Sequence, residues 1–308
     1  MLITEEAGVR KLKSLHRKEI IVNPTPITWA NSVCRVFIDT AISGCGNGCK
    51  YCYVASAQNQ QALYESETFR SYMDQLRNST NFRAGRCGTL ISLCPHTEPF
   101  KTFESICLVK IALATFLPLS NPIQISTKES VPHEILEFIK INQKYNGQVV
   151  IFVSITTFTK ADIVEPNAEI PLKRIENIGQ CKLFNVACCL YVKPFIGHTL
   201  IDLPIFIDMI STNNPLAVCV GITYSNNTHL ANYRHPANLS ISSLGPNEDL
   251  FYFASEIRSC CNILTFYTSS CVSAYFRNWR TSSLIWIRHH ELCIQCRDCN
   301  TEYLAIGK

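Results

Sequence analysis

The sequence from residue 123 to residue 155 reads IQISTKESVPHEILEFIKINQKYNGQVVIFVSI. Two apolar runs, Ile123–Thr127 and Val149–Ile155, flank a helix-length segment from Pro132 to Lys144. Runs that are apolar throughout are typical of strands buried on both faces, and the first turn of a helix tolerates proline. The stretch therefore predicts a strand, a crossover helix and a second strand parallel to the first.

The same alternation continues on both sides of this unit. Further apolar runs predict strands at Val36–Asp39, Thr89–Leu93, Phe184–Val192 and Ala217–Thr223, and helix-length segments lie at Glu65–Leu76, Phe103–Leu117, Leu172–Gly179 and Leu203–Ile210. Six such units with right-handed crossovers indicate an α/β fold with a parallel sheet, either an open doubly wound sheet or an incomplete barrel.

This alternation divides the chain into three parts. Residues 34–234 carry the alternating strands and helices, and residues 1–33 form an N-terminal extension without a motif. Residues 235–308 form a Cys-rich C-terminal extension, in which we expect a helix near Asp249–Cys260 and a strand at Ile263–Thr268.

The composition is that of a globular protein, because 47% of the 308 residues are hydrophobic and 17% are charged. The net charge of +4 is too small to indicate a nucleic-acid partner without a concentrated basic patch. Charged residues interrupt the first 19 positions, so we expect no signal peptide. The longest apolar run, Ile106–Leu119, contains Lys110 and is too short to cross a membrane. We therefore expect a cytoplasmic protein.

Cysteine is the unusual residue, with 17 copies. An odd count excludes complete pairing in disulfides, and in a reducing compartment cysteines serve metals or catalysis more often than bridges. The loop from residue 39 to residue 53, DTAISGCGNGCKYCY, places Cys45, Cys49 and Cys52 at the spacing Cys-x3-Cys-x2-Cys. Random placement would produce this triplet only about 0.05 times in such a chain.

The chemistry of three thiolates in a glycine-rich loop favours a metal cluster. Glycines at positions 44, 46 and 48 let the loop fold back on itself. A structural zinc site takes four protein ligands. A 4Fe-4S cluster held by three cysteines instead leaves one iron open for a substrate or cofactor.

The loop resembles the radical S-adenosylmethionine family, whose motif is Cys-x3-Cys-x-aromatic-Cys after the first strand of an incomplete (β/α)6 barrel. Tyr51 stands in the aromatic place. The resemblance implies that residues 34–234 form this barrel and that Cys45, Cys49 and Cys52 bind a 4Fe-4S cluster. It also implies that the fourth iron chelates S-adenosylmethionine, which reduction cleaves to a 5'-deoxyadenosyl radical. The alternative interpretation is a zinc site or a buried cysteine cluster.

Within this superfamily the sequence is most similar to the spore photoproduct lyase-like group. Later motifs recur in order: Thr97-Glu98-Pro99-Phe100, Ser126-Thr127-Lys128, Ser154-Ile155-Thr156-Thr157, Glu165-Pro166, Arg174 and Lys193-Pro194-Phe195-Ile196-Gly197. Most follow the carboxyl ends of predicted strands, where barrel enzymes place their active sites. Glu98 and Phe100 stand where the group has Asp and Tyr, so the substrate class does not carry over.

The resemblance implies a cofactor-binding set of Tyr51, Thr97, Glu98, Ser126, Lys128, Ser154, Thr156 and Arg174. We expect Glu98, with Thr97 beside it, to accept a hydrogen bond from the amino group of S-adenosylmethionine. Ser126 and Lys128 would face its ribose and carboxylate. The alternative for Glu98 is a solvated loop carboxylate, and for Lys128 an ion pair at the rim.

The remaining members of this set have equally specific alternatives. Ser154 and Thr156 alternate on one strand and would contact the ribose hydroxyls, or be buried hydroxyls bonded to the backbone. Arg174 would hold the carboxylate of S-adenosylmethionine, or form a surface salt bridge.

Cys94 is the candidate catalytic residue. It follows the second predicted strand, four residues before Glu98, and its thiol can donate a hydrogen atom to a product radical. Spore photoproduct lyases have a cysteine near this point. The alternative is a small apolar side chain that packs in a strand.

A second triplet, Cys293, Cys296 and Cys299, has the close spacing of ferredoxin-type runs. Cys271 is the preferred fourth ligand, with Cys260 or Cys261 as alternatives. Since radical enzymes of this superfamily often carry an auxiliary cluster, we favour a second 4Fe-4S cluster over zinc at this site.

The resemblance implies an enzyme that abstracts hydrogen from an unidentified substrate, which is a small molecule, a peptide or a nucleic acid. The resemblance implies a reducing partner such as flavodoxin or ferredoxin, and from the shortness of the apolar runs we expect no membrane partner. Two other functions stay open: repair of a thymine lesion in DNA, and a non-catalytic iron-sulfur or zinc binding module.

Overall fold

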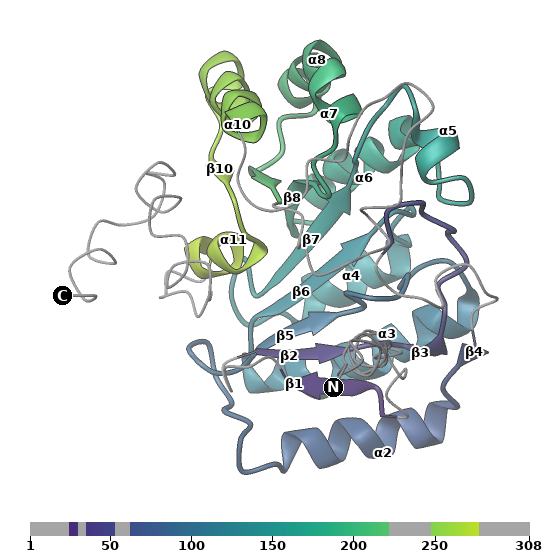
Figure 1. Ribbon diagram of the computed structural model, residues 1–308. Helices are drawn as coiled ribbons and strands as arrows, with labels where there is room; N and C mark the ends of the chain where they lie inside the picture. The colour runs from purple at the N-terminus through teal and green to yellow at the C-terminus, as the bar shows by residue number, and fades with distance from the viewer. Residues whose placement is uncertain (1–24, 30–34, 53–61, 222–247, 277–308) are drawn as a thin grey trace, which may run out of the picture.

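The structure is a computed structural model that describes residues 25–29, 35–52, 62–221 and 248–276. Its centre is an eight-stranded sheet in the order β1-β2-β5-β6-β7-β8-β9-β10 (Figure 1). The strands are β1 (Ile27–Trp29), β2 (Arg35–Ile38), β5 (Leu90–Leu93), β6 (Ile123–Thr127), β7 (Val149–Ser154), β8 (Ala187–Val192), β9 (Ala217–Val220) and β10 (Thr265–Phe266). Only β1 is antiparallel to its neighbour, so the sheet is mostly parallel.

Helices connect the parallel strands. They are α2 (Ser66–Arg77), α3 (Phe103–Phe116), α4 (His133–Asn142), α5 (Ala161–Val164), α6 (Pro171–Leu183), α7 (Gly197–Ile201), α8 (Leu203–Asn213), α10 (Glu248–Cys261) and α11 (Ser269–Phe276), with the short 3-10 helix η1 (Leu117–Leu119) after α3. A second small sheet pairs β3 (Ala41–Ser43) with β4 (Ala62–Leu63). In the described part of the chain, no helix combines the length and apolar character that crossing a membrane requires.

The predicted α/β fold with a parallel sheet is confirmed. From β2 to β10 the strand order in the sheet follows the chain order, so every crossover moves in the same direction. A doubly wound sheet would instead reverse direction at a switch point. Consecutive helices accordingly pack against each other, as α2 does on α3 and α3 on α4. The winding is therefore that of a (β/α) barrel, with β1 and β10 as the end strands of the sheet.

The sheet extends into both segments predicted as extensions. β1 pairs with β2, and β10, from the Cys-rich region, pairs in parallel with β9. The bounds of several helices also differ from the prediction, and those of α6 differ most. α6 runs past Gly179 to Leu183 because Cys181 continues its buried apolar face beyond Ile178. β8 consequently begins at Ala187, after a turn in which Asn185 has a positive φ of 54°.

The two faces of the sheet have different characters. In β2, Val36 and Ile38 are fully buried in the apolar core, while Arg35 and Phe37 on the opposite face are half-buried and line a cavity. Alternate residues of a strand point to opposite faces, so the side chains of the two sets diverge. The helices cover the apolar face of the sheet, and the opposite face lines the cavity.

Candidate active site

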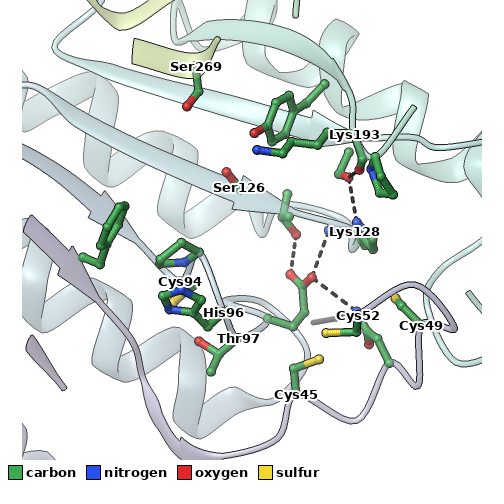
Figure 2. Close-up of a pocket in the computed structure, with 18 of the residues that line it drawn as sticks. Cys45, Cys49, Cys52, Cys94, His96, Thr97, Ser126, Lys128, Lys193 and Ser269 are labelled. Atoms are coloured by element: carbon green, nitrogen blue, oxygen red, sulfur yellow. Dashed lines mark hydrogen bonds between the residues drawn. The ribbon is translucent and has the colours of Figure 1, made fainter. Parts of the chain in front are cut away.

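A cavity of about 300 Å³ lies on the inner face of the sheet, beside the loop that follows β3 (Figure 2). All three cysteines of the first triplet border it, as do most of the predicted site residues: Cys45, Cys49, Tyr51, Cys52, Cys94, Thr97, Glu98, Ser126, Lys128 and Ser154. Thr156 and Arg174 are not part of its lining. Residues far apart in sequence meet here because the carboxyl ends of parallel strands lie at one edge.

The backbone of the cysteine loop depends on its glycines. Gly44, Gly46 and Gly48 have positive φ angles of 61°, 73° and 62°, a region that favours glycine over residues with a side chain. At Gly48 a Cβ atom would also lie 3.1 Å from the side-chain nitrogen of Asn167. These turns lie on both sides of Cys45 and directly before Cys49, so the loop bends back and presents its thiols to one cavity.

The segment after β7 forms hydrogen bonds with the cysteine loop. The Lys50 amide donates to the carbonyl of Val164 at 2.9 Å, and the Asn167 amide donates to the carbonyl of Asn47 at 3.2 Å. Lys101 links the two segments, because its Nζ donates to Asn47 Oδ1 at 2.5 Å and to the Asn167 carbonyl at 2.5 Å. Sequence reasoning missed this lysine, which lies three residues after Glu98.

The triplet has the donor set that an iron-sulfur cluster requires. None of the three cysteines is in a disulfide, and all three face the same cavity. Burial raises the pKa of Cys45, and it raises the pKa of Cys49 to about 12, so both are neutral thiols, which a bound metal would deprotonate. Among the residues that the structure describes, no three His, Cys, Asp or Glu side chains surround one single-ion position.

Glu98 lies buried at the cavity wall, with 4% of its surface exposed. Its carboxylate accepts hydrogen bonds from Thr127 Oγ1 at 2.5 Å, from the Lys128 amide at 2.9 Å and from Asn47 Nδ2 at 3.4 Å. Burial raises the pKa of Glu98 to about 7, although these hydrogen bonds partly oppose the shift. The pKa of Glu98 is thus close to neutral pH, where a neighbouring cation decides the charge of the carboxyl group.

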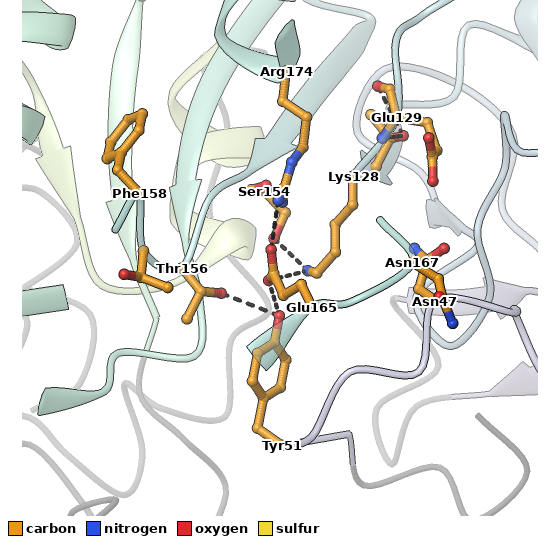
Figure 3. A network of polar contacts seen from close by, with 12 residues as sticks. Asn47, Tyr51, Lys128, Glu129, Ser154, Thr156, Phe158, Glu165, Asn167 and Arg174 are labelled. Carbon is orange, nitrogen blue, oxygen red and sulfur yellow. Dashed lines mark hydrogen bonds and ion pairs between the residues drawn. The ribbon is translucent and has the colours of Figure 1, made fainter. Parts of the chain in front are cut away.

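A buried network centres on Glu165, a residue of the Glu165-Pro166 motif for which the sequence predicted no role (Figure 3). The Tyr51 hydroxyl donates to its carboxylate, which also forms an ion pair with Arg174 at 2.6 Å. Lys128 Nζ lies 3.6 Å from the same carboxylate and donates to Ser154 Oγ at 2.7 Å. Burial tends to raise the pKa of Glu165, but the charges of Lys128 and Arg174 lower it below its ordinary value.

The structure places neither Arg174 nor Thr156 in the cavity lining, and Thr156 has the alternative given for it above, a buried hydroxyl bonded to the backbone. Arg174 is fully buried, and its Nη1 donates to the Ser154 carbonyl at 2.7 Å. The guanidinium therefore contacts Glu165 and the backbone of β7. Thr156 Oγ1 lies 3.2 Å from the Tyr51 hydroxyl and donates to the carbonyl of Lys193 at 3.2 Å. Both residues therefore lie behind the lining side chains, which sequence position alone could not indicate.

Cys94 lies at the end of β5 and borders the cavity. Its Sγ is 3.6 Å from Thr40 Oγ1, and its φ of 54° is unusual for a residue with a side chain. Burial raises the pKa of Cys94 to about 12, so it carries its S–H hydrogen at neutral pH. Beside it, His96 Nδ1 lies 2.8 Å from Asp39 Oδ2, and Thr97 Oγ1 donates to Asp39 at 3.2 Å.

The second predicted metal site is only partly within the described residues. Cys271 is buried in α11 and accepts a hydrogen bond from Thr268 Oγ1 at 3.8 Å. The alternatives Cys260 and Cys261 lie at the end of α10. Cys293, Cys296 and Cys299 fall outside the described residues, so the second centre stays a prediction.

Comparison with protein families and with curated proteins gave no match to this sequence. Solved structures do match. SuiB from Streptococcus suis bound to S-adenosylmethionine aligns at 11% identity and a TM-score of 0.52, over 85% of this chain and 54% of SuiB. SuiB bound to its precursor peptide SuiA aligns at 11% identity and a TM-score of 0.53, over 85% and 53%.

A third match has a lower score. A spore photoproduct lyase mutant aligns at 13% identity and a TM-score of 0.47, over 63% of this chain and 58% of the lyase. The chain thus spans about half the length of SuiB. The chain has the fold of SuiB. The strand order of this chain and its cavity at the carboxyl ends of the strands agree with that likeness.

Proposed function

We propose that this protein is a radical S-adenosylmethionine enzyme built on an incomplete (β/α)6 barrel. Cys45, Cys49 and Cys52 would hold a 4Fe-4S cluster, which on reduction cleaves S-adenosylmethionine to a 5'-deoxyadenosyl radical that abstracts hydrogen from a substrate. The observation that carries the proposal is that three cysteines in the family's spacing border one cavity together with Glu98 and Lys128. The fold shared with SuiB, a protein solved with S-adenosylmethionine bound, supports it.

The charges around the cavity suit the amino acid part of S-adenosylmethionine. Its ammonium group beside Glu98 would favour the ionised form of a carboxyl whose pKa lies near 7. Lys128 supplies a positive charge for the carboxylate of the cofactor. Ser126 and Ser154 offer hydroxyls at the wall, and Thr97 completes the polar side next to Glu98.

Arg174 and Thr156 act through other residues in this proposal. Arg174 fixes the Glu165 carboxylate, which accepts the hydrogen bond of the Tyr51 hydroxyl. Thr156 contacts the same hydroxyl. Because Tyr51 lies between Cys49 and Cys52 in the chain, these contacts hold the ring and therefore the loop. Both are positioning residues, and direct contact with the cofactor is not required of them.

Cys94 is the proposed hydrogen-atom donor. The S–H bond breaks as a C–H bond forms on a carbon-centred product radical, and a sulfur-centred radical remains on Cys94. An electron from a reducing protein such as flavodoxin or ferredoxin, with a proton from solvent, restores the thiol. The buried, protonated state of Cys94 at the cavity wall supports this role.

The C-terminal cysteines would form a second metal centre with Cys271, and a 4Fe-4S cluster is favoured over zinc. The metal content of the anaerobically reconstituted chain tests this part. About eight iron atoms per chain support the second cluster, whereas about four iron atoms and one zinc ion support the alternative.

The decisive experiment for the main function is formation of 5'-deoxyadenosine. The full chain is reconstituted anaerobically with iron and sulfide, then given S-adenosylmethionine and dithionite. We expect the wild-type protein and the control Cys87→Ala, which removes an exposed cysteine, to form 5'-deoxyadenosine. Cys45→Ala should form none. Absence of product from the wild type, or undiminished product from Cys45→Ala, would contradict the proposal.

A further inference from the structure

Cys94 is held in place by the chain segment that follows β2. Its amide donates to the carbonyl of Ile38 at 2.7 Å, and its Sγ lies 3.6 Å from Thr40 Oγ1. The first contact fixes a backbone whose φ of 54° is costly for a residue with a side chain. Cys94 borders the cavity, whereas Thr40 is buried and is not part of the cavity lining. Thr40 therefore lies on the side of the thiol that faces away from the cavity.

Two buried hydroxyls connect this thiol to a backbone carbonyl. Ser105 Oγ donates to the carbonyl of Glu98 at 3.1 Å, and Thr40 Oγ1 lies 3.0 Å from Ser105 Oγ. Ser105 comes from the first turn of α3, and neither hydroxyl borders the cavity. We call Ser105 and Thr40 the hydroxyl pair.

The carbonyl of Glu98 fixes the direction of each hydrogen bond in this series. A carbonyl only accepts, and a hydroxyl has a single hydrogen to donate. Ser105 donates to Glu98 and therefore accepts from Thr40, so the hydrogen of Thr40 is also in use. Thr40 can then only accept from the thiol. The S–H hydrogen of Cys94 consequently points at Thr40 Oγ1.

The second hydroxyl beside Cys94 does not donate to the sulfur either. Thr97 contacts Cys94, and its Oγ1 donates to Asp39 Oδ1 at 3.2 Å. Its single hydrogen is therefore in use as well. Thr97 borders the cavity and Thr40 does not, so it is the bond to Thr40 that directs the Cys94 hydrogen out of the cavity.

We propose that Thr40, oriented by Ser105, is a positioning residue that turns the hydrogen of Cys94 away from the cavity. The consequence for catalysis rests on the proposed function. An S–H bond is weaker than most C–H bonds, so an undirected thiol at the cavity wall would give its hydrogen to the 5'-deoxyadenosyl radical before a substrate did. The hydrogen bond to Thr40 is weak, and rotation about the Cβ–Sγ bond later delivers the same hydrogen to the product radical.

Infrared absorption by the S–H stretch of the full chain tests the direction of these hydrogen bonds. The difference between each protein and the same protein carrying Cys94→Ala isolates the band of Cys94. An S–H donor that loses its acceptor absorbs at a higher wavenumber, and we expect this shift in Thr40→Val. Thr40→Ser restores the hydroxyl and should keep the wild-type band. The control Thr68→Val, which removes an exposed hydroxyl from α2, should keep it as well.

Ser105→Ala distinguishes the inferred order of donors from the reverse order. In the inferred order this change frees the hydrogen of Thr40 to donate to the sulfur, so the Cys94 band shifts although Thr40 is present. In the reverse order Ser105 donates to Thr40 and Thr40 donates to Sγ, so loss of Ser105 leaves the Cys94 band in place. An unshifted band in either Thr40→Val or Ser105→Ala would overturn the inference.

Isotope transfer tests the consequence for the radical. The reconstituted chain is given S-adenosylmethionine and dithionite in deuterium oxide, without a substrate, so that Cys94 carries an S–D bond. When Cys94 quenches the radical, the S–D bond breaks and a C–D bond forms at the 5' carbon. The sulfur radical that remains takes an electron from dithionite and a deuteron from the solvent.

We expect Thr40→Val to place about threefold more deuterium in 5'-deoxyadenosine than the wild type does, the effect of losing one weak hydrogen bond. Both values are taken above the background of the matching protein with Cys94→Ala. Thr40→Ser and Thr68→Val should behave like the wild type. Equal incorporation by Thr40→Val and the wild type, measured by mass spectrometry, would contradict the inference.

The two measurements separate this inference from the proposed function. If the wild type forms no 5'-deoxyadenosine on reduction, the proposed function fails, and the infrared bands still decide how Thr40 holds the thiol. If it forms 5'-deoxyadenosine but the Cys94 band is the same in the wild type and Thr40→Val, only the inference fails.

Discussion

Replacing Glu165 by glutamine tests the buried network that holds the cysteine loop. The carboxylate and the Arg174 guanidinium have almost no exposed surface and lie 2.6 Å apart. At an effective dielectric constant of about 20, unit charges at this distance attract by roughly 6 kcal/mol. Glutamine keeps the size and part of the hydrogen bonding but leaves a buried cation without its counter-charge. We therefore expect a loss of about 3 kcal/mol, at the low end for breaking a buried ion pair.

Urea unfolding at pH 7, followed by circular dichroism, measures this loss. Glu176→Gln is the matched control, because it removes an exposed carboxylate from α6 and should change the free energy of unfolding by less than about 0.5 kcal/mol. The double variant Glu165→Leu with Arg174→Leu removes both charges and should recover much of the loss. If Glu165→Gln proves as stable as Glu176→Gln, the ion pair does not stabilise the fold.

The pH dependence gives an independent check on the same residue. The pKa of Glu165 is lower in the folded protein than in the unfolded chain, so the unfolded chain binds the proton first as the pH falls. The stability from Glu165 is thus present above the unfolded pKa of about 4.3 and is lost as the pH falls through the folded pKa. Between pH 7 and pH 3 the gap between wild type and Glu165→Gln should narrow, and a constant gap would refute the electrostatic explanation.

Three further predictions concern the cavity. The pKa of Glu98 is raised to about 7, so between about pH 4.3 and pH 7 the folded protein holds a proton on Glu98 that the unfolded chain has lost. The stability of the wild type relative to Glu98→Gln should therefore fall as the pH rises from about 4.3 to 7. A pH-independent difference in urea unfolding would count against this prediction. Lys101→Met removes the donor that links Asn47 to Asn167. A chelator should therefore remove iron from the reconstituted Lys101→Met variant about tenfold faster than from the control Lys173→Met, which lacks an exposed lysine. Equal rates of iron loss, followed by absorbance, would contradict this prediction. Cys94→Ala should raise the ratio of 5'-deoxyadenosine to product once a substrate is found, and an unchanged ratio by chromatography would reduce Cys94 to a packing residue.

Much of the site was predictable because its chemistry follows strand ends. Glu98, Ser126, Lys128 and Ser154 each close an apolar run or follow it closely, and the parallel sheet brings such positions to one edge. Arg174 shows where this reasoning fails. It lies on a helix, and no local pattern distinguishes an arginine directed at a ligand from one directed at a buried carboxylate.

The missed residues have weak local signals. Lys101 is one lysine in a loop, and it became a candidate only when its three neighbours in space were known. Arg35 occupies the first position of a short strand whose next residues are apolar. Lys193 opens the motif Lys193-Pro194-Phe195-Ile196-Gly197, but its orientation into the cavity depends on Gly221, at the end of a different strand.

The sequence by itself determined the parallel α/β class and the cysteine triplet, because hydrophobic periodicity and residue spacing are local properties of a chain. Only the tertiary structure decided that the strands wind in one direction, that β1 and β10 join the same sheet, and that Glu165 anchors Tyr51 from 114 residues away. Strand order and the pairing of buried charges depend on contacts between residues distant in sequence. Their free energy arises only when the packed fold brings those groups together and removes them from water.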